Sequence, residues 1–359
     1  MGAGTEQEGD SQAVHTPAGS GVSVPGLVGA GVLFVIAVLM LAAGLELARE
    51  QAEGVVTQLV RGHVSALGSG WLVSYLVLSA TFVADLTVGL VHVGVVDPVE
   101  GLLMVTGSRL GAAGIVVLIG GVHYLQVREA RLRASLELGV LTFLVSHAVF
   151  LPAGALGYLA LLAADRFTGL PAPTSGARLP EAAAVLPESV AFRLGLLAVA
   201  LILLYVSIRA LDAQVSRLDL EALRGDRFQE LERPWVAFTA GASLTAITTS
   251  VAFSVGLLVP LYNQAAITRR AMIPYLLGAG IGTFSDTLLV AVVLGSAPGL
   301  VVLGALMVAA TIVTLLSLLL APVSLDALAE VLERVTRTRT RLLFLLLALG
   351  VTPVLLVLI

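Results

Sequence analysis

The sequence contains no cysteine, no lysine and few charged residues of any kind. All 20 basic residues are arginine, and charged residues make up only 12% of the chain, about half the share that is usual in soluble domains. Without cysteine, disulfides, thiolate metal sites and cysteine nucleophiles are excluded. Without lysine, the chain has neither a P-loop lysine for ATP phosphates nor a Schiff base, so any transport would draw on an ion gradient.

Apolar residues fill most of the remainder, at 58% of the chain and a mean hydropathy of +1.01. Several apolar runs reach the roughly 20 residues that span a bilayer as a helix. They lie at 26–47, 98–126, 136–163, 190–212, 271–295, 298–322 and 342–359. These runs are too numerous for a signal anchor, so we expect an all-α polytopic protein of the plasma membrane.

The chain also repeats itself, because residues 78–114 resemble residues 249–285 at a shift of 171 positions. The matched positions are Ser79 with Ser250, Phe82 with Phe253, Leu86 with Leu257, Gly107 with Gly278, and Gly111 with Gly282. In both copies a spanning run and an amphipathic polar stretch come first. Paired repeats of this kind are typical of secondary transporters.

The distribution of arginine indicates how the two copies lie in the membrane. If the segments 71–96 and 236–267 each enter and leave on one side, and the N-terminus is cytoplasmic, fourteen arginines lie inside and five outside. If both segments cross once, the split becomes nine to ten and the positive-inside bias disappears. We therefore expect two re-entrant helical hairpins that enter from opposite sides, and hence two inverted-topology repeats.

The expected organisation has five parts. A disordered polar tail at 1–25 precedes a first membrane repeat at 26–163, and an external Pro-rich connector at 164–189 leads to a second repeat at 190–322. An amphipathic basic segment and a last transmembrane helix follow at 323–359. Within each repeat a re-entrant hairpin, 71–96 or 236–267, precedes a glycine-broken transmembrane helix, 98–126 or 271–295.

Hydroxyls and glycines gather where these hairpins and broken helices would meet. Non-helical backbone at membrane depth is tolerated only inside protein or beside water, and its free N–H and C=O groups suit an anion and Na⁺ respectively. The expected anion-binding residues are Ser79, Thr81, Arg109, Thr249, Ser250, Gly278 and Gly280. The expected cation-binding residues are Asp85, Thr248, Thr283, Ser285 and Asp286. Alternatively, the tip hydroxyls only permit close helix packing or bond their own backbone.

The order of hairpin, glycine-broken span and inverted second copy resembles the sodium-dependent phosphate cotransporter family. That family has a Gln-Ser-Ser-Ser tip and then Gly-Ala-Asn-Ile-Gly-Thr in each repeat. The second copy here reads TSVA at 249–252 and GAGIGT at 278–283, and the first reads LSAT at 78–81 and GSRLGA at 107–112. The resemblance covers roughly 30–320 and implies phosphate as substrate and sodium as coupling ion, without another cofactor. Both tip glutamines and both Asn positions are replaced.

Arg109 stands where the family has its first Asn. A charge at the bilayer centre is costly unless it is paired, and a guanidinium binds phosphate or carboxylate through two parallel hydrogen bonds. An anion ligand is one interpretation, and an internal ion pair with Asp85 or Asp286 is the other. Asp286 could coordinate Na⁺ or carry a proton, and the same two roles are open to Asp85.

These residues predict a secondary active transporter of inorganic phosphate, or of a similar small anion, coupled to sodium by alternating access. The alternatives are a non-transporting membrane sensor or scaffold, and a proton-coupled transporter or exporter of another small anion. We expect no enzymatic activity, because no nucleophile and base pair or metal-ligand cluster stands out in the sequence. The expected partners are phosphate, sodium and the lipid bilayer, with no nucleic acid, and a homo-oligomer is left open.

Overall fold

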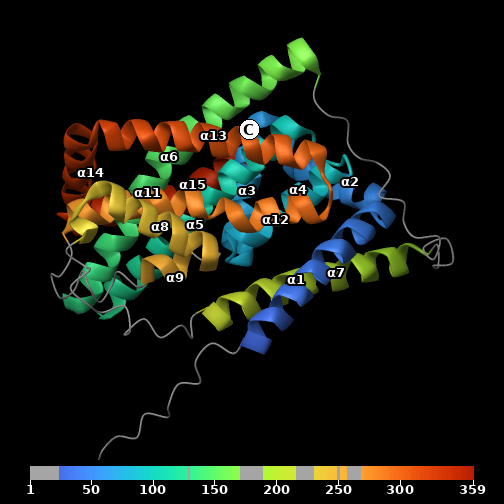
Figure 1. Ribbon diagram of the computed structural model, residues 1–359, viewed down its shortest axis with the longest axis horizontal. Coiled ribbons are helices and arrows are strands. Elements are labelled where there is room, and N and C mark those ends of the chain that lie inside the picture. Colours follow the sequence, from blue (N-terminus) through green and yellow to red (C-terminus); the bar gives the residue numbers. More distant parts are fainter. Residues whose placement is uncertain (1–23, 128–129, 170–188, 216–229, 249–250, 257–267) are drawn as a thin grey trace, which may run out of the picture.

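A computed structural model describes residues 24–127, 130–169, 189–215, 230–248, 251–256 and 268–359 (Figure 1). These residues fold into helices, and none of them lies in a β-strand. The helices are α1 (Val24–Leu47), α2 (Arg49–Leu59), α3 (His63–Val77), α4 (Ala80–His92), α5 (Pro98–Val127), α6 (Ala130–Thr168), α7 (Val190–Val215), α8 (Pro234–Thr248), α9 (Val251–Gly256), α11 (Arg269–Gly282), α12 (Phe284–Val293), α13 (Ala297–Leu319), α14 (Ala321–Thr336) and α15 (Arg339–Leu358).

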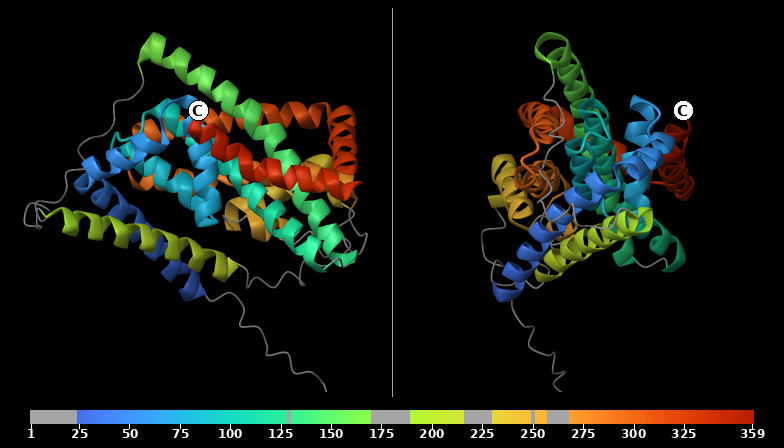
Figure 2. Two further views of the ribbon diagram at one scale, coloured as in Figure 1. Left: turned by 180° about the vertical axis from the view of Figure 1, so that it is seen from behind. Right: turned by 90° about the vertical axis from the view of Figure 1, so that its right-hand side faces the viewer.

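The helices form a bundle in which α5 packs against α3 and α6, while α11 packs against α8. Helices α1 and α7 pack on each other and lie side by side at the edge of the bundle, as Figures 1 and 2 show from different sides. Short polar helices such as α2 connect the longer ones. The fold places α4, α5 and α12 together near the middle of the bundle, where the candidate site lies.

Helix α1 shows why this bundle belongs in a membrane. Its buried side chains include Phe34, Val38, Leu41 and Leu45, which follow the three- and four-residue spacing of one helix face. Its exposed side chains, among them Val28, Val32, Ile36 and Leu39, follow the same spacing and are also apolar. A helix that is apolar on its buried and exposed faces is stable where the surrounding solvent is lipid.

Six segments of the described chain are long and apolar enough to cross a membrane: Val24–Leu47, Glu137–Arg166, Val190–Gln214, Ala271–Val293, Ala297–Leu319 and Thr340–Leu358. They correspond to six of the predicted spanning runs. The remaining run, 98–126, forms helix α5 of 30 residues. The prediction of an all-α polytopic membrane protein is confirmed.

The helix boundaries repeat at the shift found in the sequence. Helices α3 and α8 begin 171 positions apart, at His63 and Pro234, and each has 15 residues. Helices α4 and α9 begin at Ala80 and Val251, and α5 and α11 begin at Pro98 and Arg269, again 171 positions apart in both pairs. The shift of 171 therefore relates helices as well as residues. The opposite orientation of the two copies in the membrane stays a prediction, as does the re-entrant depth of their hairpins.

Equivalent glycines join the corresponding helices in both copies. A Cβ on Gly70 of α3 would collide with the carbonyl oxygen of Met104, and a Cβ on Gly107 of α5 would collide with that of Leu67. The second copy contains the same two contacts, because Gly241 meets the carbonyl oxygen of Tyr275 and Gly278 meets that of Phe238. All four glycines thus allow two helix backbones to touch, which is the usual role of small residues in membrane helix packing.

The predicted glycine break in the first copy is wrong. Helix α5 runs without interruption from Pro98 to Val127, through the glycines of 107–114. Gly107, Gly111 and Gly114 instead face α3, where Cβ atoms would collide with Leu67, Ser74 and Tyr75. Glycine permits both a break in a helix and the close approach of two helices. In α5 the glycines allow the close approach to α3.

The second copy is interrupted, but only at one residue. Helix α11 ends at Gly282 and α12 begins at Phe284, while Thr283 between them keeps right-handed φ and ψ angles of −66° and −10°. The Thr283 hydroxyl donates to the carbonyl oxygen of Gly280 at 2.8 Å, a backbone contact that often bends helices. The predicted broken helix 271–295 is therefore a local interruption between two nearly continuous helices.

The predicted hairpins correspond to pairs of helices with shifted bounds. Helices α3 and α4 pack on each other and meet at Leu78, whose φ of 54° places it in the left-handed region. The first pair therefore begins at His63, earlier than the predicted 71, and ends at His92. In the second copy α8 contacts α9, and residues 249–250 and 257–267 lie outside the described residues. So do 1–23 of the predicted tail and 170–188 of the predicted connector.

Candidate functional site

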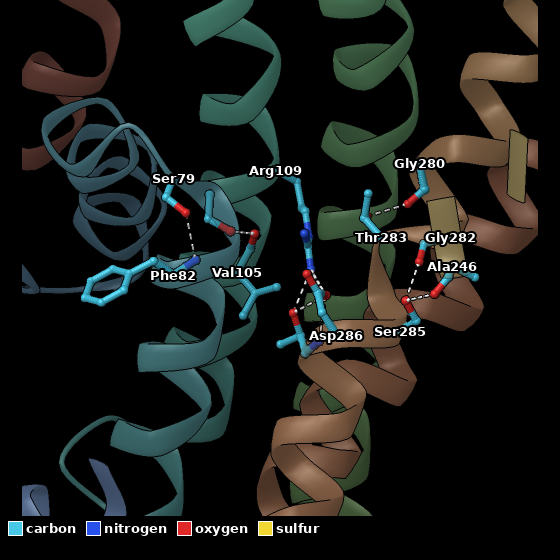
Figure 3. A network of polar contacts seen from close by, with 12 residues as sticks. Ser79, Phe82, Val105, Arg109, Ala246, Gly280, Gly282, Thr283, Ser285 and Asp286 are labelled. Atoms are coloured by element: carbon cyan, nitrogen blue, oxygen red, sulfur yellow. Dashed lines mark hydrogen bonds and ion pairs between the residues drawn. The ribbon is translucent and has the colours of Figure 1, made fainter. Parts of the chain in front are cut away.

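The centre of the candidate site is the side chain of Arg109. It comes from α5 and points between the helices toward the first turn of α12, as Figure 3 shows. Only 4% of Arg109 is exposed. Its Nη2 atom donates to the hydroxyl of Thr287 at 2.9 Å and lies 3.9 Å from Oδ1 of Asp286. Its guanidinium carbon also lies 5.3 Å from the ring centroid of Phe284, within the range of a cation–π contact.

The first turn of α12 is built to hold a negative charge. Asp286 lies in that turn, where the N–H groups of a helix N-terminus stabilise anions. The backbone N–H of Thr287 donates to Oδ1 of Asp286 at 2.6 Å, and the Thr287 hydroxyl donates to the same oxygen at 3.0 Å. The Thr287 hydroxyl therefore joins Arg109 to Asp286, because it accepts from the arginine and donates to the carboxylate. Oδ2 of Asp286 has no hydrogen-bond partner among the described residues.

A second carboxylate lies close to this group. Asp85 of α4 is fully buried, and neither of its oxygens has a hydrogen-bond partner in the described part of the chain. Asp286 and Arg109 are both near enough to act on it electrostatically. Two carboxylates thus share one guanidinium in a buried place. Because burying an uncompensated charge is costly, this cluster favours the presence of one further cation or proton.

The hydroxyls predicted at the first hairpin tip have separate environments. The Ser79 side chain accepts from the backbone N–H of Phe82 at 3.2 Å and caps the N-terminus of α4. Figure 3 shows this contact away from Arg109. Thr81 lies close enough to Asp286 for its hydroxyl to act on the carboxylate. The structure therefore brings Thr81 to the Arg109 site and gives Ser79 a role in helix capping.

Hydroxyls at the second interruption bond the protein backbone. The Ser285 hydroxyl donates to the carbonyl oxygens of Ala246 at 3.1 Å and Gly282 at 3.0 Å, and Thr283 donates to Gly280 as described above. The contact with Ala246 ties α12 to α8, and the contacts with Gly282 and Gly280 are made with the end of α11 (Figure 3). They place several carbonyl and hydroxyl oxygens next to the turn that carries Asp286.

The end of α8 contributes two further hydroxyls. Thr245 and Thr248 are fully buried, and neither Oγ1 atom has a hydrogen-bond partner among the described residues. Being three positions apart on a helix, they share one face. Thr248 was predicted as a cation ligand, whereas Thr245 was not. The predicted ligands Thr249 and Ser250, which follow directly, lie outside the described residues.

The two predicted glycine ligands differ from each other. Gly278 is closed off by the backbone of Phe238, so it serves to pack α11 on α8. Gly280 has more room, because a Cβ there would lie 3.7 Å from the ring of Phe150, an ordinary van der Waals distance. The Phe150 ring in turn lies 6.1 Å from that of Phe284, centroid to centroid. Gly280 therefore borders the aromatic side of the Arg109 site.

Sequence reasoning missed Thr287, Phe284 and Thr245. Thr287 directly follows the predicted Asp286, and Phe284 precedes it by two positions. Thr287 and Phe284 could have been found from their position in the first helical turn after a predicted interruption. The N–H groups and side chains of such a turn point toward one ligand. Thr245 could have been found from its spacing of three residues to Thr248.

Comparison with known proteins points to one family. Residues 33–170 match the Na⁺/Pi-cotransporter family, a range that includes α3, α4 and α5 and hence Asp85 and Arg109. No curated protein and no solved structure matches the chain. The match agrees with the resemblance carried by the glycine motif at 278–283, which lies outside the matched range. Residues 33–170 of this multi-pass membrane protein are thus similar to the Na⁺/Pi-cotransporter family.

Proposed function

We propose that the protein is a secondary active transporter that moves inorganic phosphate, or a similar small anion, together with Na⁺ across the plasma membrane by alternating access. The family match over 33–170 supports the substrate class. The buried guanidinium of Arg109 between the two repeats is the observation that carries the proposal. The N-terminus lies on the cytoplasmic side in this proposal.

Arg109 has unused capacity for an anion. A guanidinium has five N–H donors in a fixed fork. In the described structure one side-chain hydrogen bond leaves this guanidinium, to Thr287, and Nε has no partner. A phosphate oxygen pair matches such a fork through two parallel, charge-assisted hydrogen bonds. We therefore place the anion at Arg109, with Thr81 at its edge.

The position of Arg109 also suits alternating access. It extends from α5 of the first repeat and bonds α12 of the second repeat. An anion bound there would contact both repeats, so its binding would affect how they move against each other. We place Na⁺ at the second interruption, with Thr248 and the carbonyl oxygens of Ala246 and Gly282 as its candidate ligands. Na⁺ sites in transporters use such carbonyls beside interrupted helices.

The test is uptake of radiolabelled phosphate by proteoliposomes under an inward Na⁺ gradient. Wild-type protein should accumulate phosphate, and removing the gradient should abolish the accumulation. Arg109→Ala should raise the KM for phosphate about tenfold or more, because a hydrogen bond to a charged group contributes about 1.5–3 kcal/mol. Arg109→Lys should restore little affinity, since an ammonium keeps the charge but lacks the fork.

Arg209→Ala is the matched control. Arg209 is exposed, and its guanidinium bonds the Tyr205 hydroxyl of its own helix at 3.0 and 3.1 Å. This variant should keep the wild-type KM. An Arg109→Ala variant with wild-type affinity for both ions would remove Arg109 from the site.

One observation favours a second function. The unbroken α5 offers no free backbone groups to an ion at its glycines. A non-transporting sensor or scaffold of the same fold would not need such groups. In that case proteoliposomes would take up neither phosphate, arsenate nor sulfate, with Na⁺ or with H⁺. The same uptake assay thus separates the two functions.

A further inference from the structure

Three groups of the first turn of α12 close on Arg109 in this structure. They are the Thr287 hydroxyl at 2.9 Å, the Asp286 carboxylate at 3.9 Å and the Phe284 ring at 5.3 Å. Arg109 belongs to α5 and so to the other repeat. Arg109, the residue proposed to bind the anion, therefore also makes the contact between the two repeats at this point.

The Asp286 carboxylate is held close to the guanidinium without bonding it fully. A separation of 3.9 Å between Nη2 and Oδ1 exceeds the usual hydrogen-bond length. The N–H and hydroxyl groups of Thr287 hold Oδ1 in this place, and Oδ2 has no partner among the described residues. A small movement would therefore bring the carboxylate into direct contact with Arg109 or away from it.

Carboxylate and phosphate are both oxyanions that a guanidinium binds through the same fork. They cannot both take the same donors of Arg109. Resting on the proposed function, we infer that Asp286 is a tethered counter-ion that occupies Arg109 when no substrate is bound, and that the transported anion displaces it. Asp286 then sets substrate affinity by competing for the arginine.

This arrangement has a consequence for the transport cycle. The empty transporter must change its orientation with Arg109 still buried, and an unpaired charge at membrane depth is costly. Asp286 neutralises Arg109 in the empty state, whereas the bound anion neutralises it in the loaded state. Asp286 is therefore needed for the return of the empty transporter and dispensable for the movement of the loaded one.

Asp286→Asn tests this role, because asparagine keeps an oxygen that accepts from Thr287 and loses only the charge. Equilibrium binding of radiolabelled phosphate to purified variant should show a Kd about tenfold lower than wild type. Net Na⁺-driven uptake into proteoliposomes should fall about tenfold, whereas exchange of internal for external phosphate should fall by a clearly smaller factor. Asp165→Asn, the same change at an exposed position of α6, should alter none of the three.

A stability measurement covers the case of a weakened fold. Because Asp286→Asn leaves Arg109 with only the more weakly placed Asp85 as a nearby carboxylate, the variant should unfold at a lower temperature, and saturating phosphate should raise its Tm by more than it raises that of wild type. Equal Tm shifts in both proteins would overturn the inference.

The outcomes separate this inference from the proposed function. If wild-type protein neither binds nor exchanges phosphate, the proposed function fails and the inference fails with it. If wild type transports phosphate but Asp286→Asn leaves the Kd unchanged, or reduces exchange as much as net uptake, the inference alone fails.

Discussion

Alanine at Gly282 should destabilise the protein by a predictable steric effect. A Cβ there would lie 2.5 Å from the carbonyl oxygen of Ala242 and 2.9 Å from both the backbone nitrogen of Ala246 and the Cβ of Thr245. Ordinary contact begins at 3.4 Å, so α8 and α11 would have to separate by about 0.9 Å at this point, a shift of the size that overpacking forces on a backbone. Two of the three neighbours are backbone atoms, which cannot turn away.

The expected cost of this overpacking is about 1–3 kcal/mol. Alanine in place of glycine also favours the helix by up to about 1 kcal/mol, which masks part of that cost. Gly304→Ala separates the two effects, because no atom lies within 4 Å of a Cβ on Gly304 in α13. The control gains the helix preference without the clash. The two variants should therefore differ by about 1–3 kcal/mol.

The assay is equilibrium unfolding of purified variants in detergent, with Gly280→Ala as a second control. Its Cβ would meet only the Phe150 ring at 3.7 Å, so it should unfold like wild type or slightly later. Gly111→Ala, at the equivalent place in the first repeat, should lose stability as well, since its Cβ would lie 2.8 Å from that of Ser74. Equal stability of Gly282→Ala and Gly304→Ala would refute the close packing of α8 and α11.

Two further outcomes follow. Ser79→Ala should cost about 1 kcal/mol of stability as a lost helix cap and leave the phosphate KM unchanged, so a raised KM would return Ser79 to the anion site. Asp97 and Thr268 are exposed positions 171 residues apart that cap α5 and α11. If the repeats are inverted, an impermeant reagent added to intact cells should label a cysteine at only one of the two positions. The same labelling at both positions would disprove the inverted repeats.

The residues that were predicted well are those whose chemistry is independent of their neighbours. Long apolar runs predict spanning helices because lipid leaves the backbone no other way to satisfy its hydrogen bonds. An ion pair of Arg109 with Asp85 or Asp286 was one of the two interpretations that the sequence left open, because a lone charge is costly at that depth. The structure places Arg109 and Asp286 3.9 Å apart. The sequence left two roles open for Arg109, an ion pair and an anion ligand. The observed position of Arg109 is compatible with both roles.

The continuity of α5 through its glycines was not predicted, because the role of a glycine depends on the facing helix. Gly107 and Gly278 are equivalent in sequence, and both let a backbone approach. What distinguishes a contact from a break is the partner glycine on the facing helix, Gly70 of α3 or Gly241 of α8. These two are also 171 positions apart, so extending the repeat toward the N-terminus would have revealed helix packing.

The shift of 171 also pairs Arg109 with Gly280. The surrounding scaffold is the same in both repeats, since Gly107 and Gly278, two residues earlier, make equivalent contacts with α3 and α8. At this one pair of positions, one repeat carries a large cation and the other carries no side chain and has room. Arg109 borders the Phe284 ring and Gly280 borders the Phe150 ring, and the centroids of these two rings lie 6.1 Å apart. The two copies therefore keep a common packing and differ where the site is formed, as expected if one arginine, shared between the repeats, provides the positive charge for a single anion.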